Sequence, residues 1–224
     1  MIEEKLKGIV LKLVDYKEAD KLASIFSFET GIISAKFTGV KRDKAKMKAA
    51  AQPFTLAEFN IVKSGEHRTI TSADIVDNFS KILLDYNKTV CGYIILDILR
   101  SILPAEKSEQ EVFLLTMSAL KNIEEKDHYI STIDFILKFM TFEGVGLEFV
   151  DSEYASLDLS TGNFIKGSQV NAKQIDKKVY RALKSIAENS QIDAQETTLK
   201  QTLRLLHNIL FIKFDEDIKS FQFI

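Results

Sequence analysis

The hydrophobic pattern of the chain changes its period near residue 80, and this change restricts what the chain can fold into. From Gly8 to about Ile75, apolar and polar residues alternate with period two, as in β-strands that bury one face. After Phe79 the apolar residues recur every three to four positions, which is the spacing of one face of an α-helix. The sequence therefore predicts an α+β chain, with a β domain over residues 1–79 and a helical domain over residues 80–224.

Turn-forming residues divide the β domain into five predicted strands. The separators are Asp15–Glu18, Glu29–Gly31 and Lys63–Glu66, and one longer connection follows the third strand. Short strands at this spacing favour a small closed or half-closed barrel. Three groups of residues are each predicted to share one face of a strand: Ile9, Leu11 and Leu13; Leu22, Ser24, Phe26 and Phe28; Ile33, Ala35 and Phe37.

The helical domain begins with two predicted helices on either side of a proline. The first runs from Phe79 to Leu103, because Pro104 cannot continue it. Ser108 and Glu111 then have the spacing of a capping box, so a second helix is expected to begin there and to reach about Glu124.

Three further helices and an insert complete the predicted pattern. One helix begins near His128 and ends at Gly144, and apolar residues at helical spacing mark two more, over residues 175–186 and 199–210. Between them, residues 146–167 alternate only weakly, and Thr161-Gly162-Asn163 is typical of a hairpin turn. We therefore expect a small irregular or hairpin insert within the helical domain.

Composition excludes several classes of protein. No apolar run approaches the ~18 residues of a membrane span, and the acidic N-terminus does not resemble a secretion signal, so we expect a cytoplasmic protein without membrane contact. The single cysteine, Cys91, excludes an intramolecular disulfide and a cysteine-based zinc site. Because Cys91 lies in an apolar helical pattern, it is predicted to be a buried hydrophobic residue.

Positive charge is concentrated in one place. The net charge is −2, but residues 1–80 hold 13 Lys and Arg against 11 Asp and Glu, whereas the remainder is acidic. Residues 36–48, here called the basic segment, contain one acid, Asp43, and six cations: Lys36, Lys41, Arg42, Lys44, Lys46 and Lys48. A flexible cationic loop gains free energy by releasing counterions from nucleic acid, although it can also be merely a solvated loop.

Aromatic residues on the predicted strands offer a second means of binding nucleic acid, because single strands stack their bases on exposed rings. The candidates are Phe26, Phe37, Phe54 and Phe59. A small barrel must fill its interior, so we expect most of these rings in the core and one or two on the outside.

No pattern of residues indicates catalysis. The sequence contains neither a nucleophile elbow nor a phosphate-binding glycine-rich loop, and its three histidines have no ligand spacing. We therefore predict no catalytic, cofactor-binding or metal-binding residues. Two alternatives stay open: an adaptor whose barrel binds a protein, and, more remotely, a nuclease that uses Mg²⁺ on Asp15, Glu18 and Asp20.

Four segments of the N-terminal part together form a recognisable pattern: Gly8–Lys21, Glu29-Thr30-Gly31, the basic segment and Gln52-Pro53-Phe54. This pattern resembles that of the RecO family, the bacterial recombination mediators, and the resemblance extends more weakly to Ile218–Phe223. It implies an oligonucleotide-binding (OB-fold) barrel joined to a helical domain, without enzymatic activity or a cofactor.

The resemblance also implies partners and a location. They are single- and double-stranded DNA, whose complementary strands the protein anneals, the protein RecR, the single-strand-binding protein SSB and, indirectly, RecA, which is loaded on SSB-coated strands at the bacterial nucleoid. The family's basic barrel loops correspond here to the basic segment. One departure is visible, because many members carry a four-cysteine zinc module where this chain has residues 146–167. We predict that this insert folds without metal around Phe149, Tyr154, Leu157, Leu159 and Phe164.

Overall fold

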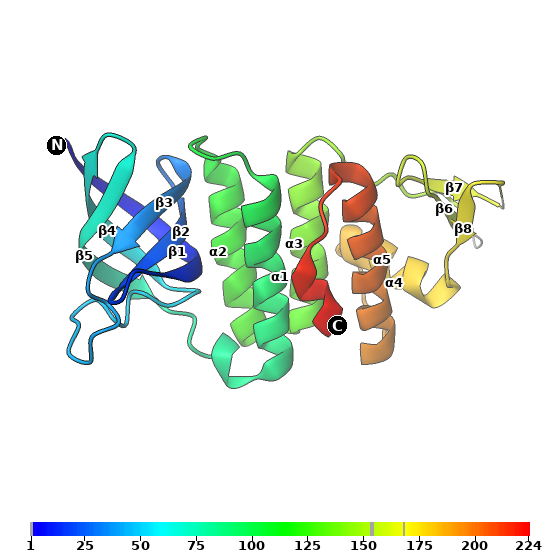
Figure 1. Ribbon diagram of the computed structural model, residues 1–224. Helices are drawn as coiled ribbons and strands as arrows, with labels where there is room; N and C mark the ends of the chain where they lie inside the picture. The colour runs from blue at the N-terminus through cyan, green and yellow to red at the C-terminus, as the bar shows by residue number, and fades with distance from the viewer. Residues whose placement is uncertain (1, 153–154, 168) are drawn as a thin grey trace. The chain divides into compact units, whose positions relative to one another are not determined.

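The computed structural model describes residues 2–152, 155–167 and 169–224, which form two compact units. One unit comprises residues 1–81 and 98–114, and the other comprises residues 82–97 and 115–224. The first unit contains five strands and the second contains most of the helical chain (Figure 1). The single domain boundary near residue 80 remains a proposal about how the chain divides.

The five strands of the first unit close into a barrel in the order β1-β2-β3-β5-β4, which confirms the number of strands predicted. Only β3 and β5 pair in parallel; the other neighbours are antiparallel. The strand bounds are β1 (Ile2–Tyr16), β2 (Asp20–Ser27), β3 (Gly31–Phe37), β4 (Leu56–Ser64) and β5 (His67–Asp77).

A bulge in β1 decides which of its residues enter the barrel. Ile33, Ala35 and Phe37 share the inner face, as predicted. The predicted grouping of Ile9 and Leu11 with Leu13 is wrong, because the pairing of β1 with β2 shifts register between Val10 and Lys12. The barrel core therefore takes Leu6 and Val10 before the shift and packs against Leu13 after it.

The outer face of β2 packs within the same unit. Phe26 and Phe28 both contact the ring of Phe113, with ring centres 5.4 and 5.6 Å apart. Phe113 lies on α2 (Gln110–Glu125), which begins two residues after Ser108. The Ser108 hydroxyl donates to the carbonyl oxygen of Phe28 at 2.9 Å, so this residue ties the start of α2 to the barrel instead of heading the helix as the capping box predicted.

The first long helix begins later than its apolar spacing predicts. Phe79 has a positive φ of 43°, and a short 3₁₀ turn, η1 (Ile82–Leu84), precedes α1 (Tyr86–Ile102). Asp85 caps α1, since its carboxylate accepts the Lys88 N–H at 2.9 Å. This hydrogen bond is the main reason that the pKa of Asp85 lies below its ordinary value.

The remaining helices follow the predicted ranges closely. Three of them contact one another: α3 (His128–Phe142), α4 (Lys177–Ala187) and α5 (Glu196–Phe214). Asp127 and Asp176 cap α3 and α4 by accepting backbone N–H groups. After α5 the chain folds back along that helix and ends in the turn η2 (Lys219–Phe223).

The insert is a small antiparallel sheet with strand order β7-β6-β8. Its first two strands, β6 (Ala155–Asp158) and β7 (Phe164–Lys166), form the predicted hairpin, in which the Gly162 N–H donates to the Asp158 carbonyl oxygen at 2.8 Å. The third strand, β8 (Ala172–Gln174), lies beyond the segment assigned to the insert from the sequence. Because β8 ends at Gln174 and α4 begins at Lys177, the last strand of the sheet is followed directly by α4.

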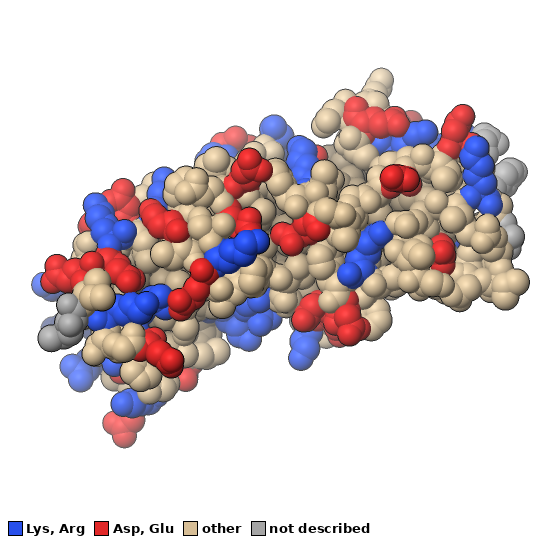
Figure 2. Space-filling model, turned by 90° about the horizontal axis from the view of Figure 1, so that it is seen from above, with Lys and Arg blue, Asp and Glu red and all other residues tan. Residues whose placement is uncertain are grey.

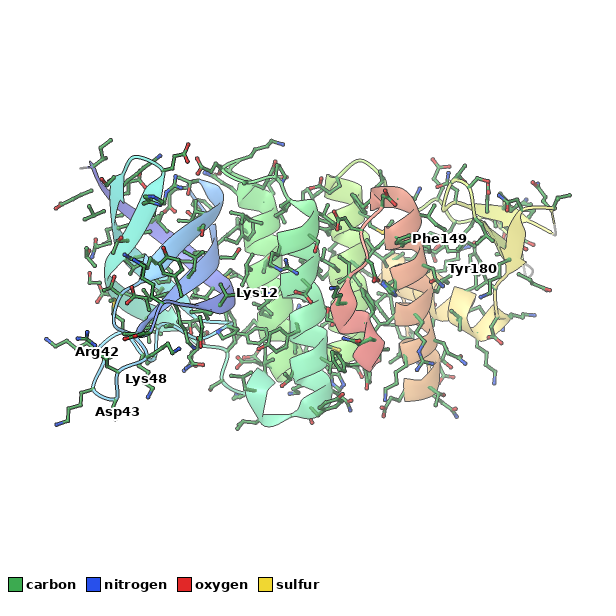
Figure 3. The ribbon with its side chains drawn as sticks, in the orientation of Figure 1. Lys12, Arg42, Asp43, Lys48, Phe149 and Tyr180 are labelled. Atoms are coloured by element: carbon green, nitrogen blue, oxygen red, sulfur yellow. The ribbon has the colours of Figure 1, made fainter. Side chains whose placement is uncertain are left out.

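An aromatic cluster joins this sheet to α4. Phe149 and Tyr180 face one another with ring centres 5.9 Å apart (Figure 3), and the ring of Phe164 completes the cluster. Of the other predicted core residues, Leu157 is buried, but Leu159 is 45% exposed and the prediction for it is wrong, because it lies after the end of β6. Tyr154 lies outside the described residues.

Candidate nucleic-acid interface

The basic segment leaves the barrel between β3 and β4, and both ends of this connection are fixed. At its start, the Gly39 N–H donates to the Asp20 carboxylate at 2.7 Å, and the Lys41 N–H donates to the Ala19 carbonyl oxygen at 3.0 Å. Val40 at one end and Ala50 and Ala51 at the other are buried in the barrel core. The cations between these anchors are thus carried on residues 41–49, here called the protrusion, whose base is fixed on the barrel.

Successive turns distribute the cations around this protrusion. Backbone N–H groups donate to carbonyl oxygens three residues earlier, from Arg42 to Gly39, from Ala45 to Arg42 and from Lys48 to Ala45. Of the six predicted cations, only Lys36 is half-buried, and the other five are exposed. Figure 3 labels Arg42, Asp43 and Lys48 on the protrusion.

Most of these cations are electrostatically uncompensated. In the part of the chain that the structure describes, no carboxylate forms an ion pair with Arg42, Lys44, Lys46 or Lys48. Lys41 differs, because its ammonium lies 2.8 Å from the Asp15 carboxylate on β1. This ammonium, helped by Lys21, holds the pKa of Asp15 below its ordinary value.

A pocket of about 310 Å³ lies between the protrusion and the end of the β1–β2 hairpin. Asp15 pairs with Lys21 across β1 and β2, and Lys21 pairs with Phe37 across β2 and β3, so these three residues lie in one row, next to the final Tyr16–Asp20 pair of the β1–β2 ladder. We call this cavity the barrel-mouth pocket; its lining residues are Asp15, Lys21, Val40, Lys41, Lys48, Ala51 and Gln52. Lys21 is not among the six cations predicted from the sequence to bind nucleic acid.

The outer face of β1, β2 and β3 carries further polar side chains. Lys12 lies opposite Ser24, which lies opposite Ser34, and directly opposed residues present their side chains on one face. In a neighbouring row Leu22 stands next to Lys36, which places Lys36 on this face and not on the protrusion. Lys12 is exposed (Figure 3) and was missed because an isolated lysine in a strand pattern carries no special signal.

None of the four aromatic strand residues considered from the sequence contributes an exposed ring. Phe26, Phe37, Phe54 and Phe59 are all 0% exposed, so the expectation that one or two of them face outward is wrong. Phe37 and Phe59 lie in the barrel core, and Phe26 packs against Phe113 of α2. Tyr16, at the end of β1, is 42% exposed, and the Lys17 ammonium lies 5.4 Å from the centre of its ring.

The residues considered for catalysis have other partners. Asp15 pairs with Lys41, and Asp20 accepts the Gly39 N–H. Among the described residues, no three His, Cys, Asp or Glu side chains gather as metal ligands would. His207 meets Asp217 at 3.1 Å and stacks on Phe221, a long-range contact that sequence spacing could not reveal.

Cys91 is buried, as predicted, and burial raises the pKa of its thiol to about 12. A thiol with this pKa is almost fully protonated at neutral pH and is a poor nucleophile. Figure 2 shows Lys and Arg interspersed with Asp and Glu over the face it presents. No helix within the described ranges is both long enough and apolar enough to cross a membrane.

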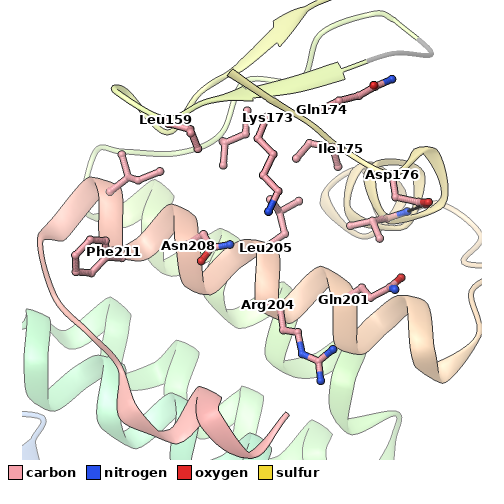
Figure 4. Close-up of a pocket in the computed structure, with 13 residues that line it drawn as sticks. Leu159, Lys173, Gln174, Ile175, Asp176, Gln201, Arg204, Leu205, Asn208 and Phe211 are labelled. Carbon is pink, nitrogen blue, oxygen red and sulfur yellow. Dashed lines mark hydrogen bonds between the residues drawn. The ribbon is translucent and has the colours of Figure 1, made fainter. Parts of the chain in front are cut away.

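A second pocket, of about 540 Å³, lies in the helical unit between the small sheet and α5 (Figure 4). Apolar side chains such as Ile175, Leu205 and Phe211 line it, together with the polar groups of Lys173 and Arg204. A concave, mostly apolar site with a few polar groups suits the binding of an apolar side chain or small ligand.

Two family models match the chain. The model described as "Recombination protein O N terminal" matches residues 1–79, and that described as "Recombination protein O C terminal" matches residues 83–220. Together they cover nearly the whole sequence.

Curated proteins named "DNA repair protein RecO" are similar to this chain. The Clostridium novyi (strain NT) protein is 30% identical over 148 residues, which cover 65% of this chain and 57% of that protein. The Caldicellulosiruptor saccharolyticus protein is 28% identical over 62% of this chain and 58% of its own length. The Clostridium perfringens (strain 13 / Type A) protein is 24% identical over 209 residues, 88% of this chain and 85% of that protein. The matched region thus spans less than two thirds of the first two relatives.

Proposed function

This chain belongs to the RecO family of DNA repair proteins, and on that premise we propose that it binds single- and double-stranded DNA through the basic segment and anneals complementary strands. We further propose that it does so without catalysing a reaction. The sites are Lys36, Lys41, Arg42, Lys44, Lys46 and Lys48, of which Lys36 contributes from the outer strand face and the others from the protrusion.

The observation that carries this proposal is the set of exposed, unpaired cations on an anchored protrusion. An ammonium or guanidinium group that has no carboxylate partner keeps its full charge for a phosphate, and each phosphate it neutralises releases counterions. Because Gly39, Val40 and Ala51 fix the base of the protrusion, less conformational entropy is lost when the cations meet the strand.

Annealing follows from which parts of the DNA such a surface contacts. Contacts to phosphates position a strand but do not read its bases, and they lower the repulsion between two strands. With Phe26, Phe37, Phe54 and Phe59 buried, these four rings do not hold bases by stacking. Because contacts to phosphates do not occupy the base edges, these edges stay free to pair with a second strand.

The helical unit is the proposed contact for RecR and SSB, through which the protein would assist the loading of RecA on SSB-coated strands. The pocket of Figure 4 supports this assignment because it is an apolar concavity in the unit that does not contain the basic segment. A direct test compares SSB binding by Phe211→Ala, which alters the pocket, and Phe142→Ala, an equally exposed phenylalanine outside it. Weaker binding by the first variant alone supports the assignment, and equal binding by both refutes it.

The DNA-binding proposal is tested by the annealing of two complementary labelled oligonucleotides, with and without SSB. The variant Arg42→Ala, Lys44→Ala, Lys46→Ala removes three unpaired cations of the protrusion. Its control, Lys126→Ala, Lys166→Ala, Lys178→Ala, removes the same charge from exposed positions in the helical unit. We expect wild type and control to accelerate annealing and the protrusion variant to do so much less. If wild type neither anneals nor binds DNA at low salt, the adaptor alternative replaces this proposal.

A further inference from the structure

The barrel-mouth pocket brings together three ammonium groups that are distant in the sequence. Lys21 comes from β2, whereas Lys41 and Lys48 come from opposite ends of the protrusion. Asp15, on β1, contributes the one carboxylate of the lining. With three cations against one anion, the lining has an excess of positive charge that favours an anionic occupant.

The pocket is built into the fold and does not depend on flexible side chains alone. Val40 and Ala51 form part of its wall and are each only 3% exposed, because they also fill the barrel core. The backbone of Lys41 is held by its N–H bond to Ala19, and Lys21 is held by strand pairing on both sides. The three ammonium groups are therefore carried by a preformed frame, which suits a small and defined anion.

The pocket lining already contains one anionic group, the Asp15 carboxylate. Oδ2 of this carboxylate lies 2.8 Å from the Lys41 ammonium, and Asp15 stands directly opposite Lys21 in the β1–β2 ladder. A carboxylate and a phosphodiester each carry one negative charge and accept hydrogen bonds through oxygen. The Asp15 side chain is 65% exposed, so it can move into water when another anion approaches Lys41.

From this arrangement, and resting on the DNA binding proposed above, we infer that the barrel-mouth pocket is a subsite for one phosphate group of the nucleic-acid backbone, at which Asp15 competes with that phosphate for Lys41. The phosphate contacts Lys41, with Lys21 and Lys48 beside it, and Asp15 is released into solvent. Asp15 thus lowers the affinity for the strand, because its ion pair with Lys41 must be exchanged on binding.

Competition between Asp15 and the phosphate predicts that the effect of Asp15→Asn depends on the presence of Lys41. Asp15→Asn leaves Lys41 unpaired and should tighten binding of a short labelled oligothymidylate at low salt by roughly two- to fivefold, the range expected for one exposed ion pair. Lys41→Ala removes the group for which Asp15 competes. In that background Asp15→Asn should add almost nothing, since the contact that it releases no longer exists.

The experiment measures the affinity of wild type, Asp15→Asn, Lys41→Ala and the double variant by fluorescence anisotropy. Asp43→Asn is the matched control, because it removes one negative charge from the protrusion itself, and in the described residues Asp43 has no ion pair with Lys41. Its effect should be smaller than that of Asp15→Asn and equal with or without Lys41→Ala. A gain from Asp15→Asn that disappears with Lys41→Ala supports the subsite.

Two results overturn the inference and differ in what else they overturn. If Asp15→Asn does not tighten binding, or tightens it equally in the Lys41→Ala background, Asp15 acts only through general charge and the subsite is refuted. DNA binding by the protrusion then still stands, provided that Arg42→Ala, Lys44→Ala, Lys46→Ala weakens it, because none of these three residues lines the pocket. If wild type binds no oligonucleotide at low salt, the subsite and the proposed function fail together.

Discussion

The ring of Phe164 meets the ring of Tyr180 nearly at right angles, with ring centres 5.1 Å apart. Phe149 packs against both rings, and the Tyr180 hydroxyl donates to the Val150 carbonyl oxygen at 2.8 Å. The small sheet is thereby attached to α4 by side-chain packing and one hydrogen bond. Two of the three rings, Phe149 and Phe164, lie in the segment where the family resemblance implies a zinc module in many members.

We predict that this insert folds without zinc and that the aromatic cluster stabilises it. Phe164→Ala should lower the free energy of unfolding by about 3 kcal/mol, as expected for a buried ring. Tyr180→Phe keeps the ring and should lower it by only about 1 kcal/mol through the lost hydrogen bond. Denaturant unfolding with and without a chelator, together with metal analysis, checks both values. Stoichiometric zinc, or a chelator-dependent midpoint, would contradict the prediction.

Arg68 forms the most buried ion pair of the barrel unit. Its side chain is 6% exposed, and its guanidinium lies 2.7 Å from Glu106 and 3.6 Å from Glu4. Arg68→Ala removes a side chain that is only 6% exposed together with its charged hydrogen bond to Glu106, so it should destabilise the protein by about 2 kcal/mol. Lys5→Ala, which breaks the exposed pair with Glu58, should have little measurable effect.

The same pair predicts how stability depends on pH. The hydrogen bond from Arg68 is the main cause that lowers the pKa of Glu106 in the folded protein. A carboxyl group with a lowered folded pKa contributes its full stabilisation above its ordinary pKa and loses it as the pH falls through the folded value. Glu106→Gln should therefore be less stable than wild type at neutral pH, and the difference should shrink in acid. Denaturant midpoints across that range test this, and a difference that grows in acid would refute it.

Two turn glycines provide a matched test of the packing around the barrel. Gly31 and Gly65 both have positive φ, at 76° and 61°. A Cβ on Gly31 would collide with the backbone carbonyl of Lys107, whereas a Cβ on Gly65 would meet nothing within 4 Å. Gly65→Ala should cost only the backbone strain, about 1 kcal/mol, and Gly31→Ala more than about 3 kcal/mol. Equal losses in thermal unfolding would show that the close approach of Lys107 is unimportant.

Local patterns were enough to predict most of the secondary structure. The five strands, the turn at Glu29-Thr30-Gly31 and the hairpin at Thr161-Gly162-Asn163 follow from residue types that act over a few positions. The errors arise where tertiary structure overrides the local pattern. The bulge after Val10 places Leu13 on the other face from Ile9, and Ser108 donates to Phe28 instead of heading its helix.

The candidate interface could be predicted only in part for the same reason. A run of cations is visible in the sequence, so Arg42 and Lys44 could be named without a structure. The partner of Lys41 could not be named, because Asp15 lies 26 residues away and reaches it only through the closure of the barrel. Lys21 enters the barrel-mouth pocket through strand register, which depends on the bulge in β1.

The salt dependence of single-strand binding is the most direct test of whether the basic segment contacts the DNA. Each phosphate neutralised on a single strand contributes about −0.7 to the slope of log affinity against log salt, so up to six cations predict a slope of roughly −2 to −4. We expect the variant Arg42→Ala, Lys44→Ala, Lys46→Ala to make this slope shallower by about 2, and the control Lys126→Ala, Lys166→Ala, Lys178→Ala to leave it unchanged. An unchanged slope in the protrusion variant, with the protein still folded, would place the DNA contact elsewhere and contradict the account.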